Sequence, residues 1–389
     1  MVEFLNAHGS KNDIFVAAMR PRDFASESDL HAFVRRLCDR NGPLGADGIY
    51  FYDAGPRVPE AWFFNPDGSS AEFCGNGMRC LGRVVLDLRG TDAVTVRSGQ
   101  REYTVRRGAT TAQGVRQISL EHPAVDFNPQ VPVVAGRSVL IRARLPELDP
   151  ALEFTAVTIP NPHLVALIDS YAESGLIAMG ERIAARRDVF PVGANLSVLL
   201  PLGSTEVFVR TFERGAGLTA SCGSGMAASR AVYSLPGRID PERRVIIRNA
   251  GGMATVSLRV RLGRWCPVLE GNATFVYRSA VDPAALARGL PATGERELYP
   301  DEIRAYSALD DRNVARLRAV GIESAAFAPA NAETLDAETL DAETVDAEHE
   351  PAGPMEHRAG QNRPDVPSVR SEPGKPAAPT AAPDRPRAR

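Results

Sequence analysis

The stretch FFNPDGSSAEFCGNGMRC, residues 63–80, joins a strand-like aromatic run to a glycine-rich turn that contains Cys74. A second stretch, ERGAGLTASCGSG at 213–225, has the same layout around Cys222 and follows the strand-like run VFVRTF at 207–212. One chain therefore carries the same Cys-Gly-x-Gly turn twice, each time after a strand. This repetition is the strongest indication of the fold and of the chemistry.

Each copy continues into a helix and then a hairpin. Apolar residues recur at helical spacing after Cys74, and this pattern ends at Gly90, whereas the second helical pattern spans residues 225–235. Hairpin patterns follow at 94–105 and 245–258. The order strand, turn, cysteine, helix and hairpin thus occurs twice. We therefore predict an α+β protein with two pseudo-symmetric domains that face each other.

A cysteine at the start of a helix has two chemical consequences. The first backbone amides of a helix have no partner inside it and form a binding site for a small anion such as a carboxylate. The same amides lower the pKa of a thiol towards a reactive thiolate. Two such helix starts would hold one carboxylate between them, with a sulfur on either side of its α-carbon. That arrangement suits a racemase or epimerase in which one thiolate removes the α-proton and the opposite thiol returns one.

Other uses of the cysteines fit less well. Cys74 and Cys80 lack the paired spacing of a zinc site. A disulfide between Cys74 and Cys222 is not expected to stabilise the fold in a reducing compartment, and its formation would block both thiols. Residues 223–228 match a dinucleotide fingerprint, but no buried strand precedes them. A non-catalytic anion- or nucleotide-binding protein remains the alternative from another class. The other cysteines are expected to be core residues: Cys38, Cys80 and Cys266.

Bulk composition narrows the class of protein. The chain has 389 residues, 44% of them hydrophobic, and a net charge of −3, so no overall field favours nucleic acid or an anionic membrane. No run is apolar enough for a membrane span, and the N-terminus does not resemble a signal peptide. Only Lys11 and Lys375 could form a Schiff base with pyridoxal phosphate, which argues against that cofactor. We expect a cytoplasmic enzyme without cofactor or metal, which binds a small amino acid and neither nucleic acid nor membrane.

The C-terminal part differs in composition. Residues 332–348 repeat the pentapeptide AETLD, and a run rich in proline, alanine and arginine follows. Such composition buries too little apolar surface to fold, so we predict a disordered low-complexity tail over 328–389. Residues 282–327 show helical patterning and are expected to form a helical appendage.

Over roughly residues 1–280 the chain resembles the diaminopimelate epimerase family, cofactor-independent isomerases that interconvert LL- and meso-2,6-diaminopimelate for lysine and peptidoglycan biosynthesis. The matching motifs are HGSKND (8–13), FFNPDGSSAEFCGNGMRC (63–80), NPH (161–163), PVGANLSV (191–198), ERGAGLTASCGSG (213–225) and GNATFVY (271–277). The resemblance implies that each domain is a mixed or antiparallel sheet or barrel around a central helix, and that the strand near Phe275 returns to the first domain. The implied domains are 1–122 plus 270–281, and 123–269.

The resemblance also implies roles for individual residues. Cys74 and Cys222 would be the acid/base pair. The main chain at four positions would bind the reacting carboxylate: Gly75, Asn76, Gly223 and Ser224. Six side chains would hold the far amino-acid group: Asn12, Asn65, Asn161, Asn195, Glu213 and Arg214.

Two positions need separate comment. His163 is a further candidate near the reacting centre, with a packed loop histidine as the alternative. Lys11 stands where the family usually has glycine, so the first loop is expected to differ. Relatives on this fold act on other amino acids, histidine among them, so a racemase of another amino acid is the alternative activity. A homodimer is compatible with the sequence.

Overall fold

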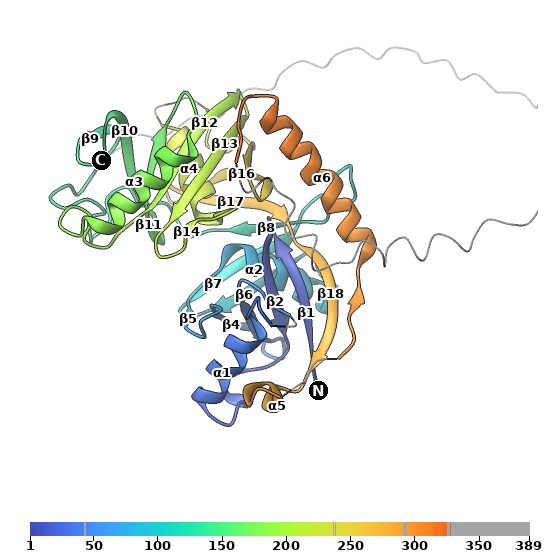
Figure 1. Cartoon of the computed structure of the whole chain (residues 1–389). Coiled ribbons are helices and arrows are strands. Elements are labelled where there is room, and N and C mark those ends of the chain that lie inside the picture. Colours follow the sequence, from blue (N-terminus) through green and yellow to red (C-terminus); the bar gives the residue numbers. More distant parts are fainter. Residues whose placement is uncertain (43, 236, 238, 291–293, 325–326, 328–389) are drawn as a thin grey trace, which may run out of the picture. The chain divides into compact units, whose positions relative to one another are not determined.

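A single mixed sheet, whose two halves are each built around one helix, organises the first 281 residues. The computed structural model describes residues 1–327 except 43, 236, 238, 291–293 and 325–326 (Figure 1). The first half contains β1 (Val2–Gly9), β2 (Asn12–Ala17), a short 3-10 helix (Pro21–Asp23), α1 (Glu27–Leu37), β3 (Ile49–Asp53), β4 (Glu60–Phe64), β5 (Ser70–Ala71), α2 (Gly75–Arg89), β6 (Ala93–Ser98), β7 (Arg101–Arg107) and β8 (Gln117–Glu121).

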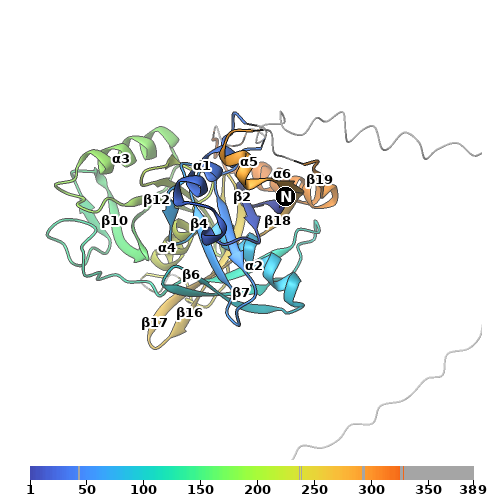
Figure 2. The ribbon, with the colours of Figure 1, turned by 90° about the horizontal axis from the view of Figure 1, so that it is seen from below.

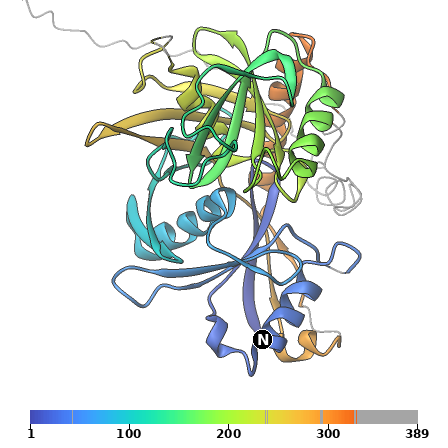
Figure 3. The same cartoon turned by 90° about the vertical axis from the view of Figure 1, so that its left-hand side faces the viewer.

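The second half repeats this order. It contains β9 (Ala143–Leu145), β10 (Asp149–Ile159), β11 (Asn161–Leu167), α3 (Glu173–Ala185), β12 (Asn195–Gly203), β13 (Glu206–Glu213), β14 (Gly217–Leu218), α4 (Gly223–Tyr233), β15 (Val245–Asn249), β16 (Gly252–Arg261) and β17 (Arg264–Asn272). After the extra strand β9, β10 to β17 correspond one by one to β1 to β8, and α3 and α4 correspond to α1 and α2. The duplication is visible in Figure 3 as one half below the other.

Strand pairing repeats with the elements. In the first half the neighbours are β1–β2 antiparallel, β2–β3 parallel, β3–β4 antiparallel, β4–β6 parallel, and β6–β7 and β7–β8 antiparallel. The second half has the same series from β10 to β17. Antiparallel pairing of β8 with β17 joins the halves. The pseudo-symmetric α+β class is therefore confirmed.

Helix α2 forms the centre of the first half. It contacts β1, β2, β3, β6, β7 and β8, and its buried side chains include Met78, Leu81 and Val85. A side chain at Gly82 would overlap Val105, so glycine lets the sheet approach closely. The helix ends at Gly90, whose φ of 59° suits a residue without a side chain. Helix α4 is central to the second half in the same way, with Met226, Ala227, Ala228 and Ala231 buried.

The remaining elements follow the repeats. They are β18 (Thr274–Val281), α5 (Pro283–Ala287), β19 (Glu297–Leu298) and α6 (Pro300–Arg318). β18 pairs with β1, so the strand near Phe275 returns to the first half as predicted. Figure 2 shows α5 near α1, which it contacts. Residues 282–327 contain the helices α5 and α6, and the helical appendage as a separate part of the protein stays a prediction. The predicted tail at 328–389 lies outside the described residues, and the domain boundaries stay a prediction, since residues 1–327 belong to one compact unit.

Candidate active site

Both motif cysteines occupy the N-cap position of a central helix. Cys74 caps α2, and its sulfur accepts a hydrogen bond from the Gly77 amide at 3.4 Å. Cys222 caps α4, and its sulfur accepts from the Gly225 amide at the same distance. The two backbone conformations agree closely, with φ and ψ of −125° and 113° at the first cysteine and −117° and 111° at the second. The two glycine-rich turns therefore place each cysteine sulfur against a backbone amide in the same geometry.

The two helix starts meet. Helices α2 and α4 are in contact, and Asn76 in the first turn of α2 donates from Nδ2 to the Ser221 carbonyl at 3.4 Å. Asn76 Oδ1 is buried and has no hydrogen-bond partner, and it would lie 3.8 Å from a Cβ at Gly223. The first turn of α2 therefore contacts the turn that precedes α4. Gly75, Asn76 and Gly223 lie together at this junction, and Ser224 contacts the sulfur of Cys222 through Oγ at 3.6 Å.

Glu213 is an acidic group that acts on both motif cysteines. It is the last residue of β13, accepts a hydrogen bond from Thr219 Oγ1 at 2.6 Å and hydrogen-bonds Cys222. Its carboxylate also acts on Cys74 through space. The sequence assigned Glu213 to the far group of the substrate, whereas the structure places it beside a sulfur.

Burial decides the pKa values of these groups. Burial raises the pKa of Cys74 to about 11, which the Gly77 amide counteracts only in part. Burial and then the Glu213 carboxylate raise the pKa of Cys222 well above its usual range. The pKa of Glu213 is also raised by burial. The backbone amides at the helix starts were expected to lower the thiol pKa values. In this structure, desolvation raises these pKa values by more than the amides lower them.

Two buried histidines lie near the junction. His163, on β11, is fully buried, and burial, then His122 and Arg214, lower its pKa to about 3. His122, just after β8, has its ring 3.6 Å from the place of a Cβ at Gly75 and packs edge-on against Phe73. Burial and then Arg79 lower its pKa to about 4. All four ring nitrogens of the two histidines lack a hydrogen-bond partner.

His122 is the residue that sequence reasoning missed. It stands in EHPA, which has no recognisable motif, and only the folding of β8 against β17 brings it to the start of α2. Both histidines are neutral at pH 7, so each ring offers one donor and one acceptor nitrogen at this junction.

The other predicted binding residues do not all lie together. Asn195, at the start of β12, lies beside His163 in parallel register, and its Oδ1 accepts from the Arg214 backbone amide at 2.8 Å. The Arg214 guanidinium donates to the Val192 carbonyl at 2.6 Å and is exposed. Asn195, Arg214 and His163 therefore lie together. Asn65 instead donates to Ser69 Oγ within the β4–β5 turn, and Asn161 begins β11. No hydrogen bond joins either of these two to the cysteines.

Asn12 connects the site to an acidic cluster in the first half. The Cys74 thiol points to Asn12 Oδ1 at 3.6 Å, while Asn12 Nδ2 donates to Asp47 at 3.1 Å. Asp47 in turn pairs with Arg40 at 2.7 Å. This network fixes the amide of Asn12 with its oxygen towards the sulfur.

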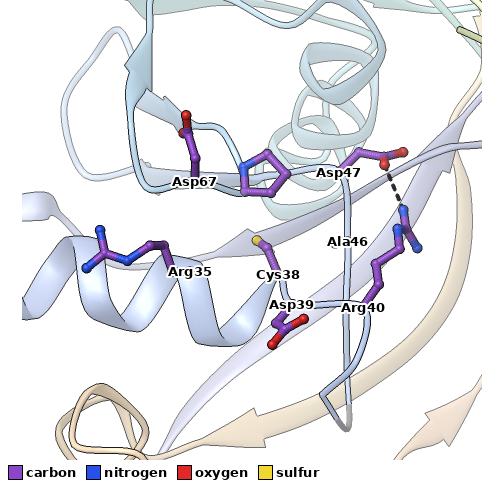
Figure 4. Close-up of a pocket in the computed structure, with 8 residues that line it drawn as sticks. Arg35, Cys38, Asp39, Arg40, Ala46, Asp47 and Asp67 are labelled. Atoms are coloured by element: carbon purple, nitrogen blue, oxygen red, sulfur yellow. Dashed lines mark hydrogen bonds and ion pairs between the residues drawn. The ribbon is translucent and has the colours of Figure 1, made fainter. Parts of the chain in front are cut away.

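Asp47 and Arg40 also line a pocket of about 480 Å³, shown in Figure 4. Its lining is Arg35, Cys38, Asp39, Arg40, Ala46, Asp47, Pro66 and Asp67. Burial raises the pKa of its thiol, Cys38, to about 12, so that sulfur is inert at neutral pH. The pocket reaches Asn12 through Asp47, and its lining contains neither motif cysteine, so we do not assign the reaction to it.

The described residues show neither a metal site nor a membrane-spanning helix. Among the residues with described positions, no group of three or more His, Cys, Asp or Glu side chains could hold a metal ion. Within the same part of the chain, no helix has the length and apolar character needed to cross a bilayer.

Comparison with known proteins agrees with this geometry. The family model for diaminopimelate epimerase matches residues 4–116 and 155–276, which contain both cysteine turns. A diaminopimelate epimerase from Enterococcus faecalis is 34% identical over 319 residues, covering 77% of this chain and 97% of the relative. One from Ligilactobacillus salivarius is 33% identical over 321 residues with the same coverage, and one from Clostridium acetobutylicum is 30% identical, covering 72% of this chain and 86% of the relative.

Solved structures support the fold. A phenazine biosynthesis protein of the PhzF family from Bacillus anthracis superposes with a TM-score of 0.52 at 15% identity, covering 71% of this chain and 97% of the other. A PhzF-family protein from Enterococcus faecalis gives 0.51 at 14% identity, with the same coverage. These likenesses concern the fold alone. Since the family model spans both halves and relatives reach 30–34% identity over most of their length, the chain belongs to the diaminopimelate epimerase family.

Proposed function

We propose that this protein interconverts LL- and meso-diaminopimelate by moving a proton at one α-carbon, with Cys74 and Cys222 as the two acid/base groups. The observation that carries the proposal is the meeting of two cysteine-capped helix starts, joined by the contact of Asn76 with Ser221. The curated relatives, which are named diaminopimelate epimerase, support the substrate.

The proton balance needs no external reagent. One sulfur, as thiolate, takes the α-proton from its side, and the C–H electron pair moves into the substrate carboxylate. The opposite thiol then gives its proton to the other face of the carbon, which inverts the centre and leaves a thiolate. Each turnover therefore exchanges the roles of the two sulfurs, and the reverse reaction starts from the state that the forward reaction leaves.

Backbone amides stabilise the negative charge that forms. The carboxylate of the reacting centre would lie between the first turns of α2 and α4, near Gly75, Asn76, Gly223 and Ser224. Free amides at a helix start point outwards and favour an anion. Because they are fixed before the reaction, they stabilise the enolate-like charge without reorganisation.

The raised thiol pKa values fit a site that becomes reactive when occupied. Burial favours both cysteines as neutral thiols. A substrate ammonium group beside a sulfur would favour the thiolate by its opposite charge. We propose that the two halves close on the substrate and exclude water. The neutral His163 and His122 rings would then lie at the edge of the reacting centre.

The far end of the substrate would be held by Arg214 and asparagine side chains. An arginine offers a planar pair of donors to a carboxylate, and Asn195 orients the Arg214 backbone. A substrate without a second amino-acid head would leave these groups unpaired, which disfavours it. This supports diaminopimelate over the alternative of a racemase for a one-headed amino acid.

The test is hydrogen exchange from heavy water. The purified full chain is incubated in ²H₂O with LL-diaminopimelate, meso-diaminopimelate, L-lysine or L-histidine, and deuterium at the α-carbon is followed by NMR. We expect exchange with both diaminopimelate isomers and conversion between them. Exchange with histidine or lysine alone would show that the chemistry is right and the substrate wrong. If no amino acid exchanges, the proposed activity is wrong, and the alternative of a non-catalytic anion-binding protein is favoured.

Substituting Glu213 should shift the pH dependence. In the wild type the Glu213 carboxylate raises the pKa of both Cys222 and Cys74. In Glu213→Gln that charge is gone, so both thiol pKa values fall and each limb of the bell-shaped profile of kcat/KM moves to lower pH. The matched control is Glu102→Gln, an exposed residue of β7 that pairs with Arg97 of β6, and it should leave the profile unchanged. A profile that stays in place in Glu213→Gln would contradict the assignment.

Cellular location and assembly stay proposals. We place the protein in the cytoplasm, where thiols stay reduced and the amino-acid substrate would be available. A homodimer is also proposed, and sedimentation of the full chain would test it.

A further inference from the structure

Helix α6 lies outside the matched family region, which ends at residue 276. Five of its side chains make polar contacts with the two halves of the duplication. They are Glu302, Tyr306, Asp310, Asn313 and Arg316, which we call the α6 contact face. Their spacing of three or four residues places them on one side of the helix. Figure 1 shows α6 in orange beside β16 and β18, both of which it contacts.

The two ends of this face contact different halves. At the N-terminal end, Glu302 forms a bidentate ion pair with Arg83 of α2, and both N–O distances are 2.6 Å. It also accepts from the Phe275 amide. At the C-terminal end, Arg316 pairs with Glu206 of β13 at 2.8 Å. Helix α6 therefore spans both halves of the duplication.

Between these ends, the helix contacts the turn that joins β1 to β2. The Tyr306 ring packs edge-on against His8 at 4.3 Å between centroids, and its hydroxyl donates to the Gly251 carbonyl of the second half at 2.6 Å. Asp310 pairs with Lys11 at 2.6 Å, and both side chains are largely buried, with 16% and 12% exposed. The turn is also confined from the other side, because a side chain at Gly251 would overlap the Ser10 carbonyl.

This turn has a left-handed backbone at two successive residues that carry side chains. Ser10 has φ of 58° and Lys11 has φ of 62°. Residues with a side chain are unfavourable in this region, so the conformation requires support from its surroundings. The ion pair of Lys11 with Asp310 is a contact that can supply it. A glycine at position 11 would not need that support.

The next residue along the chain contacts the reactive sulfur. Asn12 follows the turn directly, and its Oδ1 lies 3.6 Å from Cys74 Sγ. A turn that relaxes would move this oxygen relative to the sulfur. We infer that Asp310, acting through Lys11 and Asn12, is a positioning residue for Cys74, with Tyr306 holding the same turn between the two halves. The inference rests on the proposed role of Cys74.

The experiment compares two double variants that have the same net charge. Lys11→Gly/Asp310→Asn and Lys11→Ala/Asp310→Asn both lack the ion pair and differ only by one methyl group at a left-handed position. The full chain of each is assayed for kcat and KM with diaminopimelate. The single variant Asp310→Asn and the exposed neighbour Asp311→Asn complete the set.

We expect Asp310→Asn to lower kcat about fivefold to tenfold with little change in KM. The glycine double variant should recover to within about twofold of the wild type, because glycine adopts the turn without support. The alanine double variant should stay impaired, and Asp311→Asn should behave as the wild type.

A second readout does not depend on the substrate. The rate at which iodoacetamide alkylates Cys74 is followed against pH by mass spectrometry. In Asp310→Asn and in the alanine double variant, the thiol loses its acceptor on Asn12, so the midpoint should move to lower pH, while the glycine double variant should keep the wild-type midpoint.

Failure of the proposed function and failure of this inference give different results. If the wild type exchanges no amino acid, the proposed function fails, and the alkylation midpoints still test the positioning role. If the glycine and alanine double variants have equal kcat and equal midpoints, the inference is overturned. It is also overturned if Asp310→Asn lowers the melting temperature and kcat together and glycine at position 11 restores neither.

Discussion

Cys74→Ser and Cys222→Ser should each lose epimerisation of diaminopimelate by about 10²- to 10⁴-fold, the usual contribution of one general acid or base. A serine hydroxyl has almost no conjugate base at neutral pH, so the substituted side of the substrate lacks a proton acceptor. The measurement is the initial rate of conversion between the LL and meso isomers, with the melting temperature as a check on folding.

The single variants should also differ from each other in one respect. In each, the remaining cysteine can still remove the α-proton from the isomer that faces it and return solvent deuterium to the same side. Exchange without inversion should therefore persist with one isomer in Cys74→Ser and with the other isomer in Cys222→Ser. The control is Cys266→Ser, which replaces a buried thiol of β17 that caps neither helix, and it should be as active as the wild type. If either motif variant kept full epimerisation, the paired role would be wrong.

Arg214→Ala should raise KM for diaminopimelate and lower kcat/KM about a hundredfold, because a charge-assisted pair of hydrogen bonds to the far carboxylate is lost. Arg214 is exposed, and within the part of the chain that the structure describes its guanidinium makes one hydrogen bond, to the Val192 carbonyl, so further donors can reach a ligand. The preference for diaminopimelate over lysine, which has no second carboxylate, should shrink by a similar factor. Steady-state kinetics with both substrates measures this.

The matched control is Arg186→Ala, an exposed arginine in an ion pair with Asp188 at the end of α3. It should leave KM unchanged. An Arg214→Ala variant with the KM of the wild type would show that the far carboxylate binds elsewhere, and the role proposed for Arg214 would then be wrong.

The repeated architecture could be predicted because it depends on local signals. A glycine-rich turn, a helical period and a hairpin each have a recognisable pattern, and α2 ends at Gly90 as that pattern indicates. The positions of the cysteines at two helix starts follow from the same turns. The sequence also indicated the helix over Pro300–Arg318.

Long-range features could not be predicted in this way. The thiol pKa values depend on burial among side chains from both halves, so the expectation of lowered values at a helix start was wrong. His122 reaches the junction only because β8 pairs with β17. The contact between Asp310 and Lys11 joins residues that are almost 300 positions apart, and the unusual lysine gave only the hint that its turn would differ.

The central claim is that two sulfurs act on opposite faces of a single carbon. Its most direct test is the label in the product at low conversion in ²H₂O. The account predicts that meso-diaminopimelate newly formed from LL-diaminopimelate carries one solvent deuterium at the inverted carbon, while the remaining substrate is almost unlabelled. Product that retains the hydrogen of the substrate at that carbon would mean that one group serves both faces, and would contradict the account.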